Sequence, residues 1–483
     1  MLNDGIIKQL EKIVGKESLL DSIEDRIAYS YDGTALISSL PDAVVIPHST
    51  EEISKILRLA NEESFSVVPR GSGTGLSGGS IPLENSVVLL MNKWDKIIEI
   101  DQANLTAWVE PGVITGKLQS IAESFGLMYP PDPGSSQICT IGGNVAENAG
   151  GLRGLKYGVT KNYVLGLEMV LPTGDVMQVG GKNIKDVAGY NLKDIMIGSE
   201  GTLAVFTKIL LKLIPRPQTS KTILAFFDTM GGAAETVAAI IANKILPSML
   251  EFLDNSTIRA VDDFAKLGLD TNADALLLME VDGPQAIVAD EASAIESICK
   301  RTGSKSLIVA RDEEEATRLK AARKSAFAAL ARIRPTTILE DATVPRSEVP
   351  RLVDFINRTA RKYNVQIGTF GHAGDGNLHP TGLTDERNTE ELNKMKNAFD
   401  EIFEKAISLG GTITGEHGVG LAKKEFMERL YNTPFIELMK KTKLMFDPNL
   451  VLNPNKIVSV TPRCEGALPK NKEQLKKFGE IYF

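Results

Sequence analysis

The 483-residue chain is poor in cysteine, in histidine and in net positive charge. Its three cysteines (Cys139, Cys299 and Cys464) lie far apart, which excludes a disulfide framework and any four-cysteine iron–sulfur cluster held by this chain alone. The formal net charge is −8 with lysine and arginine dispersed, which argues against a nucleic-acid surface. No apolar run is long enough to cross a bilayer, and the first residues mix acidic and basic side chains, unlike a signal peptide. We therefore expect a cytoplasmic protein without a membrane span.

The N-terminal half alternates short apolar runs with helical patterns. "AVVIP" and "SVVPR" read as strands, and the helix between them begins with a capping box formed by Ser49 and Glu52. "LGLEMVLPTGDVMQVGG" predicts a hairpin that turns at Pro172 to Asp175. After a linker at 216–220, strands and sizeable helices alternate, which favours an antiparallel sheet backed by helices. One such helical pattern is "EEEATRLKAARKSAFAALARI".

What is abundant in the first half is glycine. "RGSGTGLSGGS" follows a strand, and "PDPGS", "TIGGNVAENAGG" and "GSEGTL" come later. Glycine lets the backbone approach a ligand closely and point several N–H groups at a phosphate. Gly73, Gly75 and Gly78 spell G-x-G-x-x-G, but a turn and a strand follow instead of a helix, which argues against a Rossmann nicotinamide site. Tight turns would explain one cluster; four clusters favour a large, flat cofactor with a diphosphate.

Three of the four histidines fall in two glycine-rich stretches near the end of the chain. His372 and His379 stand in "FGHAGDGNLHP", and Glu416 precedes His417 in "GEHGVG". Two histidines and a carboxylate suit zinc or ferrous iron with positions left open for substrate. A structural role is the alternative for any one of these histidines.

The glycine motifs together resemble the FAD-binding domain of the vanillyl-alcohol-oxidase type family. The likeness is greatest to its branch of glycolate oxidase catalytic subunits and FAD-dependent D-lactate dehydrogenases, and it spans residues from about 40 to 457. It implies non-covalent FAD, because Thr74 and Gly75 stand where some relatives carry a flavin-linked histidine. The cofactor-binding residues that the resemblance implies are Pro69, Arg70, Gly71, Ser72, Gly73, Thr74, Gly75, Pro131, Gly134, Ser135, Gly142, Gly143, Asn148, Gly201, Val205 and Asn453.

The same resemblance implies roles for the histidine half. A divalent metal, Zn²⁺ or Fe²⁺, would be held by His372, His379 and Glu416. The catalytic residues would be His417 as general base, Arg323 as partner of the substrate carboxylate, and Asn377 as a contact to substrate or flavin. For Arg323 the alternative is a solvated helix face, because its helix is crowded with lysine and arginine.

The expected fold class is α+β, with a two-part FAD-binding domain at 1–216 and an antiparallel-sheet cap at 217–414. Residues 415–459 would return to the flavin site, and 460–483 would form a tail that either docks a partner or is disordered. The expected reaction is oxidation of a D-2-hydroxy acid, D-lactate or glycolate. Electrons would pass to an electron-transferring flavoprotein, an iron–sulfur subunit or a quinone.

Three alternative functions remain open. The protein could be a D-2-hydroxyglutarate dehydrogenase, a metallohydrolase built on the His/His/Glu set, or a non-catalytic FAD-binding subunit. A homo-oligomer and membrane association through a partner are left open.

Overall fold

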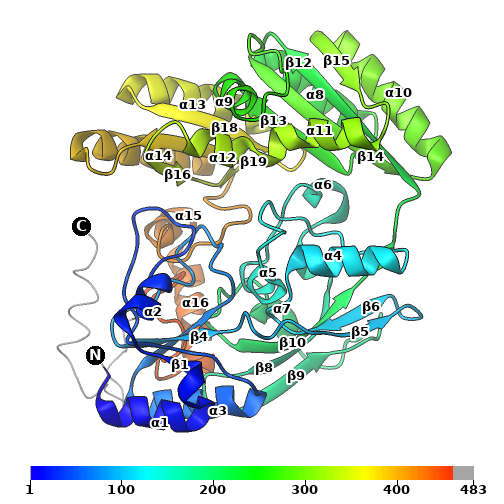
Figure 1. Cartoon of the computed structure of the whole chain (residues 1–483). Coiled ribbons are helices and arrows are strands. Elements are labelled where there is room, and N and C mark those ends of the chain that lie inside the picture. Colours follow the sequence, from blue (N-terminus) through cyan, green and yellow to red (C-terminus); the bar gives the residue numbers. More distant parts are fainter. Residues whose placement is uncertain (1, 461–483) are drawn as a thin grey trace.

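A computed structural model describes residues 2–460, so the predicted tail falls outside the described residues except for Val460. The N-terminal region holds a four-stranded sheet in which β2, β4 and β3 are parallel (Figure 1). In spatial order its strands are β1 (Leu19–Leu20), β2 (Ala43–Val45), β4 (Ser86–Leu90) and β3 (Ser66–Arg70). Both faces are covered, since Val87 and Val88 of β4 belong to different core clusters. This explains why the strands are unbroken apolar runs.

Helices α1 (Asp4–Val14) and α3 (Thr50–Glu63) cover one face of this sheet. The predicted cap of α3 is present, with Ser49 accepting a hydrogen bond from the Glu52 N–H at 3.2 Å. The Glu52 carboxylate reaches the N–H of His48 at 2.7 Å, one residue further than an ideal capping box requires.

A second sheet of five antiparallel strands follows in the chain. In spatial order it contains β5 (Ile97–Asp101), β6 (Thr106–Val109), β10 (Val205–Lys212), β8 (Val164–Val170) and β9 (Val176–Gly180). The predicted hairpin is β8–β9, and its turn is closed by Leu171 N–H to Asp175 O at 2.8 Å. The shorter elements of this half are α2 (Ile23–Ala28), α4 (Thr115–Ser124), β7 (Leu127–Met128), α5 (Ile141–Glu147), α6 (Gly154–Tyr157), α7 (Leu192–Met196) and β11 (Ile214–Pro215).

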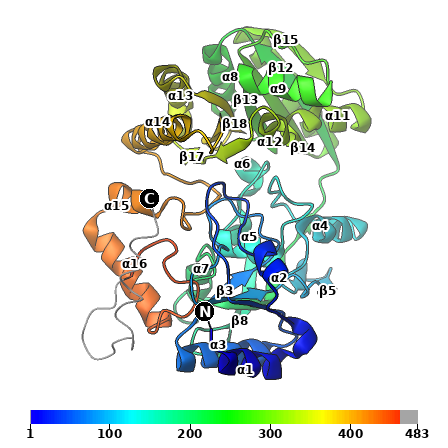
Figure 2. The same cartoon turned by 60° about the vertical axis from the view of Figure 1, so that its left-hand side comes forward.

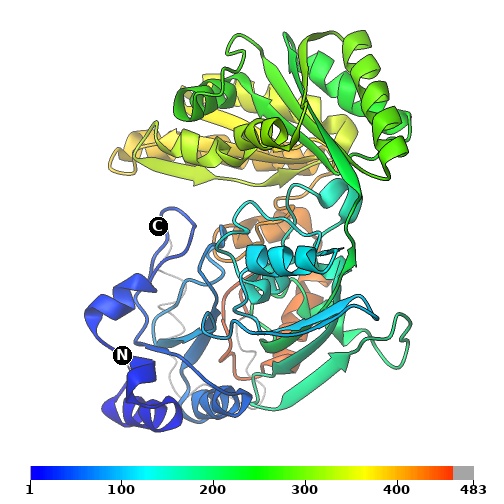
Figure 3. The same ribbon diagram turned by 45° about the vertical axis from the view of Figure 1, so that its right-hand side comes forward.

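The cap is one antiparallel sheet with helices on both faces (Figure 3). Its strands, in spatial order, are β15 (Ser304–Val309), β12 (Thr219–Phe227), β14 (Ala275–Gly283), β13 (Met249–Asp254), β18 (Gln366–His372), β19 (Asn377–Thr384) and β16 (Thr336–Leu339), with β17 (Ala342–Thr343) also paired to β19. Its helices are α8 (Met230–Ala242), α9 (Asn255–Ala265), α10 (Gln285–Arg301), α11 (Glu313–Lys324), α12 (Ala326–Ala331), α13 (Val349–Tyr363) and α14 (Thr389–Ser408). Phe226 and Phe227 of β12 point to opposite faces and enter different core clusters. The α+β class with an antiparallel cap sheet is thereby confirmed.

The single charged helix suggested by the pattern around residue 320 is in fact two helices. The chain breaks at Ser325, whose hydroxyl donates to the Ala321 carbonyl at 2.7 Å. Helix α12 then packs its apolar face on the sheet, with Ala326 and Leu330 buried. A uniform helical period in the sequence does not reveal such a break.

After α14 the chain leaves the cap and returns to the N-terminal region (Figure 2). This stretch contains α15 (Met427–Leu430) and α16 (Thr433–Phe446), and Leu452 then pairs with Val67 beside β3. Single 3₁₀ turns occupy Lys16–Ser18, Thr160–Asn162, Arg346–Glu348 and Lys424–Phe426. Within residues 2–460, none of the helices combines the length and apolar character that a bilayer span requires.

Candidate active site

A cavity of about 730 Å³ lies between the glycine-rich loops and the cap. Its volume is within the roughly 300–1,000 Å³ that is typical of cofactor sites. Most predicted cofactor residues border it: Pro69, Arg70, Gly71, Ser72, Gly73, Thr74, Gly75, Gly134, Ser135, Gly142, Gly143, Gly201 and Val205. On the cap side the wall includes Arg323 and Phe370, and the returning C-terminal segment adds Glu416 and His417.

The first glycine loop is folded tightly against the loop that begins α5. A Cβ on Gly71 would lie 2.3 Å from Oγ1 of Thr140, the residue that caps α5. Gly73 has a φ of +70°, and a Cβ there would lie 2.1 Å from Nη2 of Arg70. The side chains of Thr140 and Arg70 therefore occupy the space beside these two glycines, and the absence of a Cβ lets the loop pack closely at the border of the cavity. This arrangement fits a cofactor that is bound through its phosphates.

Four predicted site residues do not border this cavity. Asn453 is buried behind it, and its amide donates to the carbonyls of Gly79 and Glu200. Asn148 ends α5 in the left-handed conformation, and the Pro131 carbonyl accepts from Gln119. Asn377 is buried at the start of β19 and faces the turn at Gly415. None of these four residues is in contact with the cavity, so the structure does not bring them to the cofactor site as the sequence predicted.

The hairpin β18–β19 brings His372 and His379 together. Its register pairs Phe370 with His379 and His372 with Asn377, so both imidazoles lie on one face as diagonal neighbours. Glu416 approaches them from the returning segment. Its Oε1 lies 3.1 Å from Nε2 of His372 and 3.2 Å from Nε2 of His379.

The same three side chains could hold a metal ion, because one ligand atom of each lies within 4.8 Å of the others. Two ligands about 2.0–2.2 Å from one tetrahedral ion are roughly 3.3–3.6 Å apart, close to the distances of 3.1 and 3.2 Å between Glu416 and the two imidazoles. Imidazole and carboxylate are also ligand types that zinc and ferrous iron accept. His372, His379 and Glu416 are therefore a candidate metal site.

The fourth polar group of the site is His417. Its ring stacks on that of His379, with the centroids 4.9 Å apart and the planes 11° from parallel. Its Nε2 lies 3.9 Å from Oε1 of Glu416. Burial lowers the pKa of His417 to about 4, despite the nearby Asp341 carboxylate. The imidazole is therefore neutral at pH 7 and can accept a proton.

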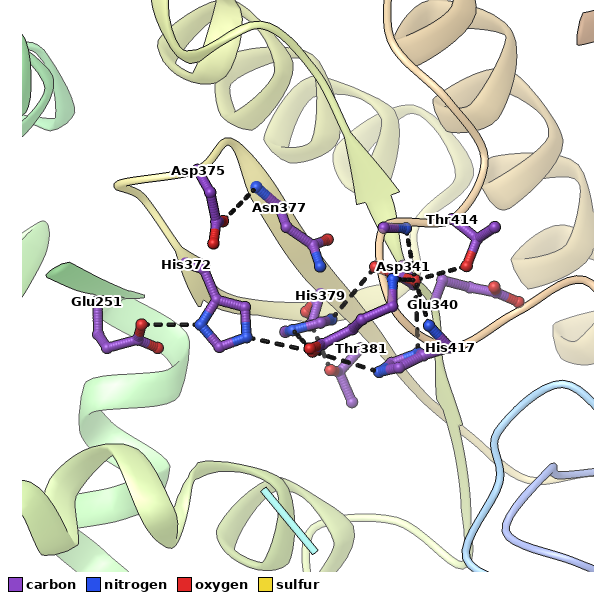
Figure 4. Close-up of polar contacts among 12 residues, drawn as sticks. Glu251, Glu340, Asp341, His372, Asp375, Asn377, His379, Thr381, Thr414 and His417 are labelled. Carbon is purple, nitrogen blue, oxygen red and sulfur yellow. Dashed lines mark hydrogen bonds and ion pairs between the residues drawn. The ribbon is translucent and has the colours of Figure 1, made fainter. Parts of the chain in front are cut away.

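Glu251 of β13, which the sequence did not single out, contacts His372 (Figure 4) and also Arg323. Its Oε1 lies 2.7 Å from Nδ1 of His372, which orients the ring so that Nε2 points at Glu416. Its Oε2 accepts from Nε of Arg323 at 2.6 Å, and the guanidinium stands over the ring of Phe370. Arg323 thus belongs to the cavity wall and is only 9% exposed, which rules out the solvated-face alternative.

Asp341, just after β16, is a second residue that the sequence did not indicate. It is fully buried, and its Oδ2 accepts from the Thr414 hydroxyl and from the N–H groups of Gly415, Glu416 and His417 at 2.7–3.0 Å. A single carboxylate oxygen therefore holds the turn that carries both Glu416 and His417. The signal available in the sequence was an acidic pair in an apolar strand, "ILEDATVP".

Two family models match the chain and account for most of its length. The model described as "FAD binding domain" matches residues 41–180. The model described as "FAD linked oxidases, C-terminal domain" matches residues 216–457. The first range contains the loop from Arg70 to Ser80, and the second contains the histidine cluster.

Curated relatives match over nearly the whole chain. "Glycolate oxidase subunit GlcD" of Bacillus subtilis is 53% identical over 96% of this chain and 98% of the relative. The protein of the same name in Escherichia coli K12 is 37% identical over 95% and 92%. "D-lactate dehydrogenase" of Archaeoglobus fulgidus is 38% identical over 89% of this chain and 95% of the relative.

Solved structures share the fold at low sequence identity. P-cresol methylhydroxylase superposes with a TM-score of 0.79 at 17% identity, covering 95% of this chain and 98% of that chain. Alkyldihydroxyacetonephosphate synthase gives a TM-score of 0.75 at 19% identity, covering 94% and 86%. The two family models, the identity to the curated relatives and the glycine-walled cavity all indicate the same family. The chain belongs to the family of FAD-linked oxidases and is an FAD-dependent oxidoreductase.

Proposed function

We propose that the chain oxidises a small D-2-hydroxy acid, D-lactate or glycolate, to the corresponding 2-oxo acid. One observation carries the proposal: His372, His379, Glu416, His417 and Arg323 all line the cavity that the glycine loops border. The names of the relatives, glycolate oxidase subunit and D-lactate dehydrogenase, point to the same substrate class.

The oxidation removes two electrons and two hydrogens from the substrate. FAD, when bound, supplies the acceptor for the hydride that leaves the α-carbon. Neutral His417 takes the hydroxyl proton on its free ring nitrogen, and its buried position keeps bulk water from competing for that nitrogen. Neither Thr74 nor Gly75 offers an imidazole for a covalent link, so we propose that FAD is held non-covalently.

The substrate carboxylate needs a cationic partner, and Arg323 supplies it. Glu251 holds Nε of Arg323, which leaves the terminal nitrogens of the guanidinium available. A planar guanidinium pairs with a carboxylate through two parallel hydrogen bonds, which fixes the orientation of the substrate.

A divalent metal, Zn²⁺ or Fe²⁺, would be held by His372, His379 and Glu416. It would supply Lewis acidity toward the substrate hydroxyl and carboxylate. The fit rests on the spacing and chemical type of the three ligand atoms, and on Glu251 behind His372.

Electrons leave the protein for a separate acceptor in this proposal. The chain has three cysteines, fewer than an iron–sulfur cluster with cysteine ligands requires. Two of them are buried apart from each other, Cys299 in the core of the cap and Cys139 at the border of the cavity. The word "subunit" in the names of two relatives fits a protein partner in this role.

An anaerobic absorption spectrum tests the proposed function directly. The purified protein is recorded before and after addition of D-lactate, L-lactate, glycolate or D-2-hydroxyglutarate. We expect D-lactate or glycolate to bleach the flavin band. Bleaching by D-2-hydroxyglutarate alone would replace the substrate assignment, and a flavin that none of the four reduces would contradict the proposed function.

A further inference from the structure

Arg70 is a buried cation beside the first glycine loop. It ends β3, is only 6% exposed and borders the cofactor cavity. Among the described residues its guanidinium forms no ion pair, and its one side-chain hydrogen bond runs from Nη1 to Oγ of Ser80 at 3.5 Å. The ring of Tyr29 lies over it, with the centroid 5.7 Å from Cζ. Because a buried charge without a partner is costly, this guanidinium needs an anion that its direct neighbours do not supply.

Asp32 acts on this cation from the segment between α2 and β2. It is buried, and its Oδ2 accepts a hydrogen bond from the Ser80 hydroxyl at 3.4 Å, so Ser80 links the carboxylate to the guanidinium. Burial lowers the pKa of Arg70, and the attraction of Asp32 is the largest effect that opposes this shift. Lys456, another buried cation that Asp32 attracts, already donates to two backbone carbonyls at 2.7 and 2.6 Å. Asp32 is therefore the counter-ion of Arg70, although the two do not touch.

The segment that carries Asp32 packs directly on the glycine loop. A Cβ on Gly33 would lie 2.8 Å from the carbonyl oxygen of Gly75 and 3.2 Å from that of Thr74, so no side chain fits between the two segments. Asp32 and Gly33 both border the cavity, although the match to the FAD-binding family model begins only at residue 41. A carboxylate at this place repels the anionic group that the glycine loop is suited to bind. Its presence is explained if it serves the protein before that group arrives.

We propose that Arg70 pairs with the diphosphate of FAD, and that Asp32 is the counter-ion that this diphosphate replaces when FAD binds. In the apoprotein Asp32 compensates the buried charge of Arg70 through Ser80. The diphosphate then supplies an anion in direct contact, because the N–H donors of a guanidinium match the oxygens of a phosphate. Arg70 and Asp32 therefore act on FAD affinity with opposite signs. The inference concerns the cofactor alone and does not depend on which acid is oxidised.

Arg70→Gln removes the charge and keeps a polar side chain. Fluorescence titration of the apoprotein measures its affinity for FAD and for riboflavin, which has the same ring system but no phosphate. We expect FAD to bind about 10- to 100-fold more weakly, the usual effect of losing a charge-assisted hydrogen bond, and riboflavin to bind as in the wild type. An equal loss for both flavins would show that Arg70 only supports the loop. An unchanged FAD affinity would remove Arg70 from the site.

Asp32→Asn is the decisive variant, because the expected change is a gain. Asparagine keeps an oxygen for the N–H of Thr34, which Oδ1 of Asp32 accepts at 2.8 Å. We expect FAD to bind about 3- to 10-fold more tightly, since the repulsion of the diphosphate is removed, and riboflavin to bind as in the wild type. The apoprotein should unfold at a lower temperature than the wild-type apoprotein, because Arg70 has lost its counter-ion. Weaker FAD binding would overturn the inference, since structural support by Asp32, or a hydrogen bond from the cofactor to it, predicts a loss.

A second arginine–aspartate pair provides matched controls. Arg58 and Asp175 lie 3.8 Å apart at the surface and do not border the cavity. Arg58→Gln and Asp175→Asn should therefore leave the affinities for FAD and riboflavin unchanged.

Arg70→Lys covers the case in which Arg70→Gln does not fold. Lysine keeps the charge but lacks the planar fork, so we expect a smaller loss of FAD affinity, again with riboflavin unaffected. Equal losses for the two flavins in this variant would contradict the pairing with the diphosphate. If the FAD affinities change as expected while no 2-hydroxy acid bleaches the flavin, the proposed function fails and the roles of Arg70 and Asp32 stand.

Discussion

At the scale of single residues, the proposed chemistry depends on a histidine that burial keeps neutral. His417 is surrounded by protein, and desolvation outweighs the attraction of Asp341, which is why its pKa is lowered to about 4. A neutral imidazole next to a buried carboxylate is unusual, because the carboxylate favours the charged form. Burial, with a smaller contribution from the stacked ring of His379, therefore keeps His417 unprotonated, while Asp341 and Glu416 oppose this effect.

Replacing His417 by alanine removes the proton acceptor while it leaves the glycine loops intact. We expect flavin reduction by substrate to slow by about 10²- to 10⁴-fold, the usual contribution of a general base, with FAD still bound. Stopped-flow absorbance under anaerobic conditions gives the rate, and the flavin spectrum gives the occupancy. The control is His48→Ala, because His48 bonds Ser18 away from the cavity. Wild-type reduction in His417→Ala would remove this residue from the mechanism.

Removing a metal ligand has a different signature from removing the base. In His372→Ala the candidate ion loses one of its three protein ligands, so we expect the metal content to fall well below one ion per chain. Elemental analysis of the purified protein measures this directly. His417→Ala is the matched control, since His417 lies in the same cluster but is not assigned as a ligand. Equal metal content in both variants would contradict the ligand assignment.

At the scale of elements, the cofactor cavity depends on how closely two glycine-rich segments approach. The first loop reaches the cap residue of α5, and the space for a side chain at Gly71 is already occupied by Thr140. The glycine is required here by contact with another segment of the chain. The sequence shows where the glycines are, but it does not show which of them another segment of the chain approaches too closely for a side chain.

A methyl group at Gly71 should therefore weaken FAD binding. In Gly71→Ala either Thr140 or the loop must move, at a cost of about 1–3 kcal/mol, which corresponds to roughly 5- to 150-fold in affinity. Fluorescence titration of the apoprotein with FAD measures this. Gly181→Ala is the control, because a Cβ there meets nothing within 4 Å. An unchanged affinity in Gly71→Ala would show that the loop adjusts freely.

Much of the fold could be predicted from the sequence because its signals are local. The hairpin at Pro172–Asp175, the cap at Ser49 and the antiparallel cap sheet all follow from short patterns and are present. The break at Ser325 was missed, since it depends on how α11 and α12 pack on the sheet.

The candidate site divides in the same way. The histidines and Glu416 were found because they stand in glycine-rich motifs. Glu251 and Asp341 were missed, because each lies in or beside an apolar strand and acquires its partners only when segments some 70 to 120 residues apart meet.

At the scale of the whole molecule, the C-terminal segment ties the histidine cluster to the FAD-binding region. Glu200 accepts the N–H groups of Val419 and Gly420 at 2.7 and 2.6 Å. Glu147 lies beside it: a Cβ on Gly418 would be 2.2 Å from Oε2 of Glu147 and 3.0 Å from Oε1 of Glu200. Two carboxyl groups are therefore buried together where the returning chain meets the turn of "GSEGTL".

This buried pair makes stability depend on pH. Burial raises the pKa of Glu200 to about 7. This effect exceeds the opposite effect of the two N–H groups, which favour the charged form and lower the pKa. Burial and the neighbouring Glu200 raise the pKa of Glu147 well above its usual value. A carboxyl group whose pKa is raised in the folded state stabilises the fold fully below its unfolded pKa near 4.5, and this contribution is lost as pH rises through the folded value.

Glu147→Gln tests the effect, because glutamine is a neutral isostere of the protonated acid. We expect the variant to be more stable than the wild type, with the difference growing by up to about 1.4 kcal/mol per pH unit above pH 4.5 until Glu147 itself ionises. Unfolding midpoints of the FAD-bound proteins between pH 5 and 9 measure the difference. Glu200→Gln should lose stability at pH 5, because an amide cannot accept both N–H groups through two oxygens, and the same linkage should make this loss smaller as pH rises. A constant difference between Glu147→Gln and the wild type across this range would show that the Glu147 carboxyl does not titrate with folding.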